Sequence, residues 1–357
     1  MKTIGSTIIM LALASSLFAD NGKELKLASP DGTHEIVFYQ KQVSPAVNEL
    51  CYRVDYKSQP VVNESRAGLE LDNRIWEMAL GVRNLKQPAC WMDNLEVDSV
   101  TYQPETNLTW QPLYGERSSV HDHYRAGTLC LSKKDNSGYR LNIEVRAYNE
   151  GVAFRYFFPE HPKAIFHKVV GDLTEYALPA GTKAWTEQWA QAFFERLNID
   201  DIKHPVERAL TFELPNGKWA ALADADVDDW CLTKYLVSTD KKNTLTSVMY
   251  SPVDVVTYYA TPWKIVMAAD KPGELLEHND IIQNLNPPCE IADAAAWVKP
   301  GKIMRETTIT TEGAIATIDF CAAHHIPYML FDWQCICPVL HMTGMLQKWL
   351  TNWICPA

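Results

Sequence analysis

A segment dense in tryptophan, phenylalanine and carboxylates, Lys183 to Asp201 (KAWTEQWAQAFFERLNIDD), interrupts an otherwise strand-like pattern. Aromatic rings beside carboxylates suit a sugar, because the C–H faces of a sugar stack on the rings and its hydroxyls hydrogen-bond to the acids. On this interpretation Trp185 binds substrate. The competing interpretation, which the residues alone favour, is that Trp185, Trp189 and Phe193 form a small aromatic core under a long loop.

A second segment, Trp110 to Arg125 (WQPLYGERSSVHDHYR), combines two histidines, two acids and two arginines. His121 and His123 together with Asp122 could bind a metal ion. Their spacing matches no specific metal site, however, so the favoured prediction is a surface loop.

The elements that would position a catalytic site are clearest from Trp297 to Trp333. Lys302 to Glu306 has the pattern of a short strand. Apolar residues spaced by three and four then predict a helix that begins near Thr311. Pro327 forbids further helix, and the apolar run Tyr328 to Phe331 is typical of a buried strand. Strand, helix and strand of these lengths predict one right-handed βαβ unit, as at the start of a (β/α)8 barrel.

Glu306 and Asp332 close the two predicted strands of this unit. In (β/α)8 barrels the chemistry lies at the carboxyl ends of the strands, so both acids are candidates for substrate binding. Alternatively, they bind water or cap the next helix, and the sequence leaves the two readings open.

Most of the remaining chain, residues 20–290, predicts a large β-sandwich. Alternating apolar and polar residues recur in Cys51 to Tyr56, Tyr139 to Ala147, Val152 to Phe158 and Trp219 to Leu222. Asn and Gly turns separate them. Many short strands in one stretch indicate stacked sheets, because each sheet exposes an apolar face that another layer must cover.

The first 19 residues predict a secretory signal peptide, since one lysine precedes an apolar run and then small residues. We therefore expect an exported protein, in a bacterial periplasm, without a membrane span. The net charge of −11 disfavours a nucleic-acid surface. Nine cysteines in an exported chain permit disulfides but lack zinc-like spacing.

Three blocks of the chain resemble glycoside hydrolase family 97, the exported bacterial α-glucosidases and α-galactosidases. They are Val145 to Phe158, Thr261 to Pro288 and Trp297 to Gly313, in the family's order. The resemblance implies a fold that is mainly β: a galactose-mutarotase-like β-super-sandwich up to residue 290, followed from residues 297–334 by the start of a catalytic (β/α)8 barrel.

The same resemblance implies a calcium ion, Ca2+, at the active site. In the family one carboxylate ligand comes from the sandwich, in a segment where a tryptophan is followed ten residues later by an aromatic residue and glutamate. Here Trp185 precedes Phe194 and Glu195, so Glu195 is the expected metal ligand. An ordinary solvated acid is the alternative.

The family's catalytic acids lie beyond the second barrel strand, so we name no catalytic residue. Residues 335–357 depart from the family pattern, and their composition, rich in cysteine and tryptophan, suggests a frameshift after Trp333. The expected function is thus an exo-acting α-glycoside hydrolase acting on an oligosaccharide or α-glycoside, present here as an inactive truncated form. The alternatives are a non-catalytic carbohydrate-binding sandwich and a sandwich that scaffolds a partner.

Overall fold

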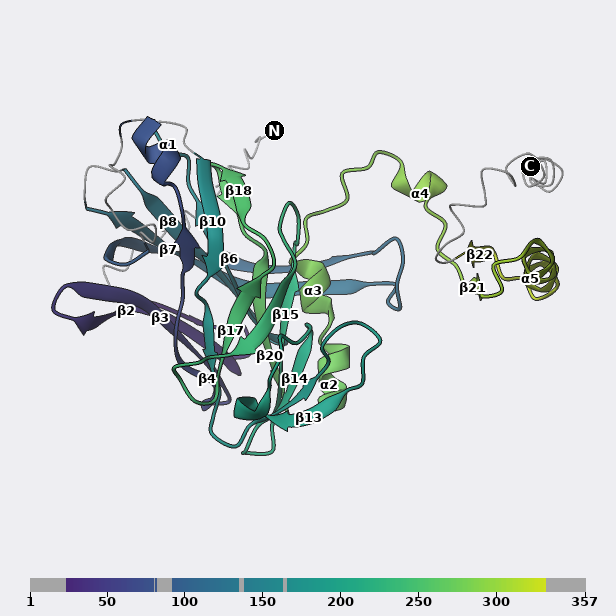
Figure 1. Ribbon diagram of the computed structural model, residues 1–357, viewed down its shortest axis with the longest axis horizontal. Coiled ribbons are helices and arrows are strands. Elements are labelled where there is room, and N and C mark those ends of the chain that lie inside the picture. Colours follow the sequence, from purple (N-terminus) through teal and green to yellow (C-terminus); the bar gives the residue numbers. More distant parts are fainter. Residues whose placement is uncertain (1–23, 80, 82–91, 135–137, 163–165, 332–357) are drawn as a thin grey trace, which may run out of the picture. The chain divides into compact units, whose positions relative to one another are not determined.

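The computed structural model describes residues 24–79, 81, 92–134, 138–162 and 166–331 (Figure 1). The predicted signal peptide, Asp332 and the tail 335–357 lie outside the described residues. The described chain is mainly β, as the sequence predicts. It divides into two compact units: residues 1–110 with 119–288, and residues 111–118 with 289–357.

The first unit is built on one antiparallel sheet of ten strands. Its strands are β6 (Leu95–Trp110), β7 (Val120–Lys133), β8 (Arg140–Tyr148), β9 (Gly151–Phe158), β12 (Lys183–Thr186), β13 (Glu195–Asn198), β14 (Leu210–Glu213), β15 (Trp219–Ala225), β19 (Tyr259–Ala260) and β20 (Trp263–Ala269). They run in the order β13-β12-β14-β15-β20-β9-β8-β7-β6, and β19 pairs with β9. The strands predicted in β8, β9 and β15 are confirmed.

Three smaller sheets cover one face of this sheet. The first contains β1 (Glu24–Ala28), β2 (His34–Ser44), β3 (Val47–Tyr56) and β4 (Gln59–Arg66). The second contains β18 (Val253–Val256), β10 (Phe166–Asp172) and β5 (Leu69–Leu71). The third contains β11 (Glu175–Ala177), β17 (Thr244–Met249) and β16 (Thr233–Val237). A short helix, α1 (Arg74–Ala79), and a 3-10 turn, η1 (Ile199–Asp201), complete this part.

The main hydrophobic core fills the space between the layers. Phe38 of β2, Tyr52 of β3 and Phe154 of β9 are fully buried there. The ring centroid of Phe154 lies 5.1 Å from that of Phe38 and 5.0 Å from that of Tyr52. Aromatic contacts across the layers therefore add packing specificity to the burial of apolar surface.

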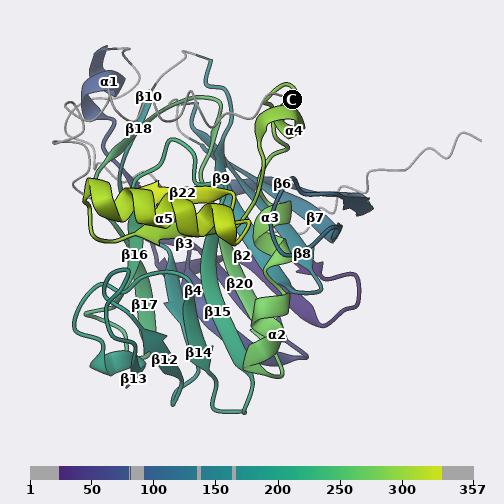
Figure 2. The same ribbon diagram turned by 90° about the vertical axis from the view of Figure 1, so that its right-hand side faces the viewer.

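A second, smaller core lies on the opposite face of the large sheet. Helices α2 (Pro272–Glu277) and α3 (Asp280–Asn284) contact this face (Figure 2). The sheet meets them with small side chains such as Ala221 and Ala223, so the helices approach the strands closely. All seven residues of β20 are consequently buried.

An ionic network crosses the interior between the layers. Lys264 of β20 forms an ion pair with Asp172 of β10, and Arg208 lies 3.3 Å from Asp224 of β15. Burial opposes the charge of Lys264, but Asp172 and Asp224 outweigh it and raise the pKa of the ammonium group. Buried charges persist only when paired in this way.

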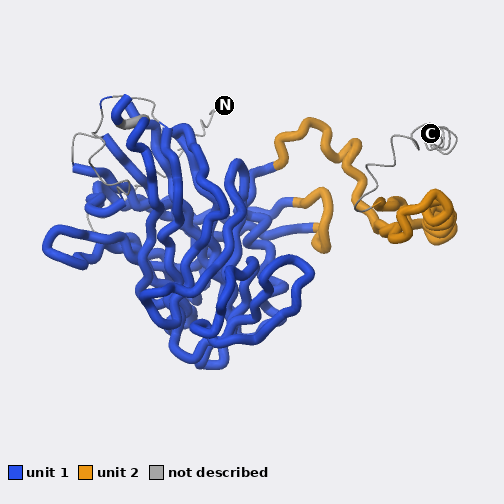
Figure 3. The backbone as a smooth tube through the Cα atoms, in the orientation of Figure 1, with its two compact units in different colours: residues 1–110, 119–288 blue, residues 111–118, 289–357 orange. Residues whose placement is uncertain are grey.

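The second unit contains the predicted βαβ motif, and Figure 3 separates it by colour from the first. After α4 (Ala294–Trp297) come β21 (Ile303–Glu306), α5 (Thr311–Ala323) and β22 (Tyr328–Phe331). β21 and β22 pair in parallel, as a crossover helix requires. Within the described residues, no helix is both long and apolar enough to cross a membrane.

Candidate functional site

The aromatic and acidic segment forms a hairpin at the end of the large sheet. β12 pairs with β14 on one side and with β13 on the other, and β13 ends the strand order. Residues 187–194 connect β12 to β13. The segment is thus an edge hairpin with a long loop.

Trp185 and Glu195 lie on opposite faces of this hairpin. Trp185 is paired with Arg196, whereas Glu195 is paired with Thr186. Because successive side chains of a strand alternate between faces, Glu195 shares a face with Thr186 and the buried Ala184. The structure therefore does not bring the two predicted residues together on one surface.

Trp185 is engaged in a polar cluster on the outer face. Its indole N–H donates to Glu213 Oε1 at 2.9 Å, and Arg196 Nε donates to the same oxygen at 2.8 Å. Hydrogen bonds from Arg196 and then Trp185 hold the pKa of Glu213 below its usual value. Trp185 is still 38% exposed as a residue. This geometry gives Trp185 a structural role and leaves part of its face accessible.

Glu195 borders a cavity of about 280 Å3 that belongs wholly to the first unit. The cavity is lined by Thr186, Gln188, Glu195, Leu197, Asp201, Ile202, Lys203, His204 and Val206. Among the described residues, the Glu195 carboxylate has no hydrogen-bond or ion-pair partner, although Thr186 Oγ1 donates to its backbone carbonyl. An exposed, unpaired carboxylate at a cavity is available to a ligand.

The aromatic residues of the loop are exposed. Trp189 is 59% exposed, Phe193 is 94% exposed and Phe194 is 66% exposed. The small aromatic core that the sequence favoured is therefore wrong, because within the first unit these side chains are exposed and do not pack into a core. The loop is nonetheless anchored at its start, where Lys234 Nζ donates to the carbonyl of Gln188 at 2.6 Å.

Glu306 has a structural role at the end of β21. Its carboxylate accepts hydrogen bonds from the backbone N–H groups of Thr308, at 2.6 Å, and Ile309, at 2.7 Å. Hydrogen bonding, first from the Thr308 hydroxyl, lowers the pKa of Glu306. The residue is 2% exposed. It shapes the turn before α5 but does not cap that helix, whose N-cap is Thr310. Asp332 lies outside the described residues.

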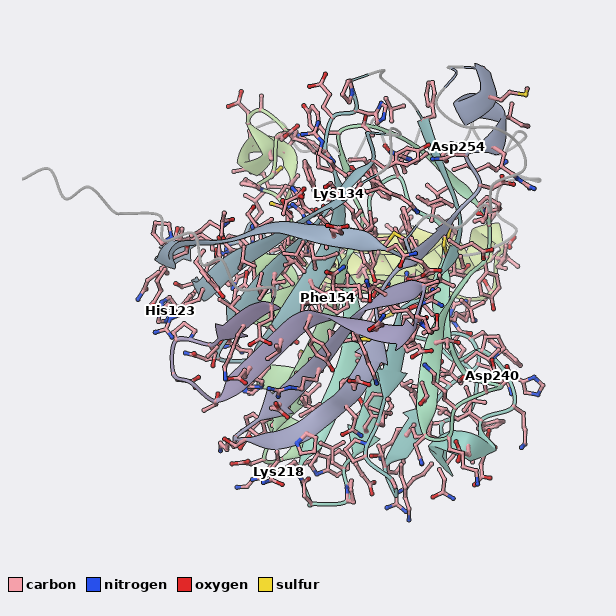
Figure 4. All side chains as sticks on the ribbon, turned by 90° about the vertical axis from the view of Figure 1, so that its left-hand side faces the viewer. His123, Lys134, Phe154, Lys218, Asp240 and Asp254 are labelled. Carbon is pink, nitrogen blue, oxygen red and sulfur yellow. The ribbon has the colours of Figure 1, made fainter. Side chains whose placement is uncertain are left out.

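His121 and His123 lie on a strand, so the predicted surface loop is wrong for them. Both belong to β7, and His121 Nε2 is 2.8 Å from Asn107 Oδ1 while His123 Nε2 is 2.7 Å from Glu105 Oε1 (Figure 4 labels His123). Asp122 points to the opposite face, as strand alternation requires. The three side chains cannot converge on one metal ion.

The described residues contain no group of three or more His, Cys, Asp or Glu side chains that could hold a metal ion. Glu195 suits calcium as a single oxygen ligand, since its carboxylate is exposed and unpaired. The other ligands of such an ion would have to come from elsewhere. The five described cysteines are free thiols.

Sequence reasoning missed two charged residues that line the Glu195 cavity, Lys203 and His204. They follow the 3-10 turn η1, and no known motif marks them. The sequence did contain one local pattern that could have indicated them, a run of charged residues directly after an edge strand, where the chain turns back toward the sheet.

Comparison with known proteins identifies the family. Residues 27–288 match the family profile described as Glycosyl-hydrolase 97 N-terminal. The chain belongs to glycoside hydrolase family 97. The galactose-mutarotase-like sandwich expected from the resemblance is thus the amino-terminal domain of this family.

Among curated proteins, the retaining alpha-galactosidase of Bacteroides thetaiotaomicron is 22% identical over 380 residues, which cover 91% of this chain and 52% of that protein. Among solved structures, a glycoside hydrolase family 97 enzyme of Pseudoalteromonas sp. strain K8 was determined with panose and with acarbose. It has a TM-score of 0.72 and 23% identity, covering 85% of this chain and 46% of that chain.

A beta-arabinopyranosidase has the same fold at a TM-score of 0.69 and 16% identity, covering 90% of this chain and 52% of that chain. The chain therefore spans about half the length of the relatives it matches.

Proposed function

We propose that this chain provides the sandwich and the first βαβ unit of an exo-acting α-glycoside hydrolase of the α-glucosidase or α-galactosidase type. The match of residues 27–288 to the family's amino-terminal domain carries the proposal. The names of the relatives support it, since one is a retaining alpha-galactosidase and another was solved with panose. The substrate class is an α-linked oligosaccharide. Such an enzyme needs two carboxylates whose separation decides the stereochemical course.

Within that enzyme, Glu195 supplies one carboxylate oxygen to a calcium ion. Calcium binds hard oxygen ligands, and the Glu195 carboxylate is the unpaired acid at the edge of the cavity. The hairpin register fixes its position, because the pairing of Glu195 with Thr186 aims the side chain to the cavity side of the sheet. The amino-terminal sequence leads us to propose export to the periplasm as well.

The test is a chimera in which residues 20–290 of this chain replace the corresponding part of the retaining alpha-galactosidase. We expect it to hydrolyse p-nitrophenyl α-galactoside or α-glucoside, to lose activity in a chelator and to regain it with calcium. Glu195→Gln should raise the calcium concentration required by at least about tenfold. Glu187→Gln, at the other end of the loop, is the matched control. Equal effects of the two substitutions would exclude Glu195 as a ligand.

Hydrolysis by the 357-residue chain itself should be assayed in parallel. Activity that disappears in Glu195→Gln would show that these residues suffice for catalysis. Inactivity of the chain beside an active chimera would assign catalysis to the half that the relatives carry in addition.

A non-catalytic carbohydrate-binding module is the second candidate function. The exposed rings of Trp189, Phe193 and Phe194 favour it, because such rings stack on sugars. Calorimetric titration of the chain with maltooligosaccharides tests this function. Absence of both heat and a thermal shift would exclude it at useful affinities.

A further inference from the structure

Three ionisable side chains meet in the interior of the first unit. Lys264 of β20 and Asp224 of β15 are directly opposite each other in the large sheet. Lys264 also forms an ion pair with Asp172 of β10, in the covering layer. The side chain of Asp172 is 1% exposed, that of Asp224 10% and that of Lys264 11%. The fold thus holds an amine, a carboxylate in contact with it and a second carboxylate beside it, largely away from solvent.

The interior favours an amide over this ion pair. In water an ammonium ion and a carboxylate are both strongly hydrated, so the separate ions are more stable than their condensation product. Burial removes hydration from both, and their mutual attraction need not compensate for the whole loss. Condensation of Lys264 with Asp172 would replace two buried charges by one neutral amide. The fold also keeps the two groups in contact, which raises their effective concentration for each other.

The two carboxylate oxygens of Asp172 have different partners. Oδ1 accepts a hydrogen bond from the backbone N–H of Thr174 at 3.0 Å, whereas Oδ2 accepts one from the ammonium group of Lys264. The Thr174 N–H can therefore stabilise the negative charge that develops on Oδ1 when a nitrogen adds to the carboxyl carbon. Oδ2 is then the oxygen that leaves, and Oδ1 becomes the carbonyl oxygen of the amide.

Asp224 is placed to move protons between these groups. Its Oδ2 atom accepts from the hydroxyl of Thr233 at 3.1 Å and lies 3.3 Å from Arg208 Nε. Burial raises the pKa of Asp224, so its carboxylate is a stronger base than an exposed one. Lys264, Asp172 and Asp224 all line a cavity of about 10 Å3, close to the space that one water molecule needs. A water molecule in this cavity can link the three groups, and the same space can receive the water that condensation releases.

We propose that Lys264 and Asp172 form an intramolecular isopeptide bond, with Asp224 transferring the protons. Lys264 Nζ bonds to the carboxyl carbon of Asp172, and the bond from that carbon to Oδ2 breaks. Two of the ammonium hydrogens leave with Oδ2 as water, and the remaining one stays on the amide nitrogen. Atoms and charge therefore balance without an oxidant or a co-reactant, and Asp224 is unchanged at the end. The ion pair is the reactant state, and the new bond joins the large sheet to the layer that covers it.

Intact mass spectrometry of the whole chain, denatured at intervals after refolding at neutral pH, tests the proposal. We expect the mass to decrease with time by that of one water molecule. Peptide mapping should find a branched peptide that joins the segments containing Asp172 and Lys264. Lys264→Arg, which keeps the positive charge, and Asp224→Asn, which keeps the shape of the acid, should each retain the full mass of their sequence. Lys41→Arg, in the exposed ion pair with Glu64, is the matched control and should lose water as the unaltered chain does.

An unaltered chain that keeps its full mass would overturn the proposal. Loss of water in Lys264→Arg would overturn it as well, because that water would come from cyclisation of an aspartate on its own backbone. Loss at an unchanged rate in Asp224→Asn would exclude Asp224 from the reaction. Near-ultraviolet circular dichroism verifies the folding of each variant, and the branched peptide is sought in the unaltered chain, so the test stands even where a variant does not fold. None of these outcomes involves sugar hydrolysis, so the proposed function is tested separately.

Discussion

Trp185 and Glu195 belong to one hairpin but face opposite sides of the sheet, because Trp185 is paired with Arg196 and Glu195 with Thr186. Trp185 is consequently tied to Glu213, while Glu195 borders the cavity. The two faces of the hairpin thus have different roles: Trp185 stabilises the hairpin on one face, and Glu195 is available to a ligand on the other.

Substitution of Trp185 by Phe should therefore affect stability more than binding. Loss of the indole N–H removes one hydrogen bond to Glu213, while Arg196 keeps that carboxylate paired. We expect the free energy of unfolding in urea to fall by about 1 kcal/mol or less. Affinity for maltooligosaccharides should not change. A loss of affinity would show that the exposed part of Trp185 contacts sugar.

Breaking the buried ion pair should cost far more stability than breaking a surface pair. Lys264→Met leaves Asp172 charged in the interior, and we expect the free energy of unfolding to fall by about 3–5 kcal/mol. The double variant Lys264→Met/Asp172→Leu should recover part of this loss. Lys41→Met, which breaks an exposed pair with Glu64, is the control and should have little effect. Similar losses in both single variants would contradict the buried network.

Stability should decrease as the pH falls below neutrality. Burial lowers the pKa of His34 to about 4 and that of His167 to about 3. As the pH falls from about 6.5 to these folded-state pKa values, each histidine binds a proton in the unfolded chain but not in the folded chain. Each histidine then removes about 1.4 kcal/mol per pH unit from the free energy of unfolding. Above about pH 6.5 both histidines are neutral in the folded and the unfolded chain, so this loss of stability is absent.

Urea denaturation at several pH values between 7 and 4.5 measures this slope. His34→Gln should reduce it by nearly one proton per molecule, and substitution of the exposed His204 by Gln serves as the control. A slope that is the same in both variants would mean that His34 is protonated in the folded protein.

Gly313→Ala should disturb the turn that Glu306 organises. A Cβ atom added at Gly313 would lie 2.7 Å from Glu306 Oε1 and would also collide with Thr308 Oγ1. The Thr308 side chain and the Glu306 carboxylate would have to shift, which weakens the hydrogen bonds that the carboxylate accepts from the backbone N–H groups of Thr308 and Ile309. Hydrogen exchange should accelerate at the amides of Thr308 and Ile309. Glu306→Gln should produce the same change, and exchange in β20 is the internal reference. Unchanged exchange at both amides would show that this turn does not depend on Glu306.

The sequence predicted the sheets well because their signals are local. Strict alternation in Tyr139 to Ala147 marked β8, and the spacing of apolar residues after Thr311 marked α5. The sandwich as a whole followed from the number of such strands. Stacking the sheets in layers buries their apolar faces.

The site was predicted less completely because its properties depend on distant contacts. His121 and His123 were expected in a loop, yet polar cross-strand partners such as Asn107 stabilise a strand there. The rings of Trp189 and Phe193 were expected in a small core, but they are exposed on the first unit. The cavity also depends on the return of the chain from η1 to the sheet, which no local pattern encodes.

The complete burial of β20 has a consequence for how this protein opens. One hydrophobic core packs on one face of β20, and the core that includes residues of α2 and α3 packs on the other. The amides of β20 should therefore be among the last to exchange with solvent. The β12–β13 hairpin, at the far end of the same sheet, is fastened along one side only. Local fluctuations of this hairpin can therefore move residues that line the Glu195 cavity while the hydrophobic core stays packed.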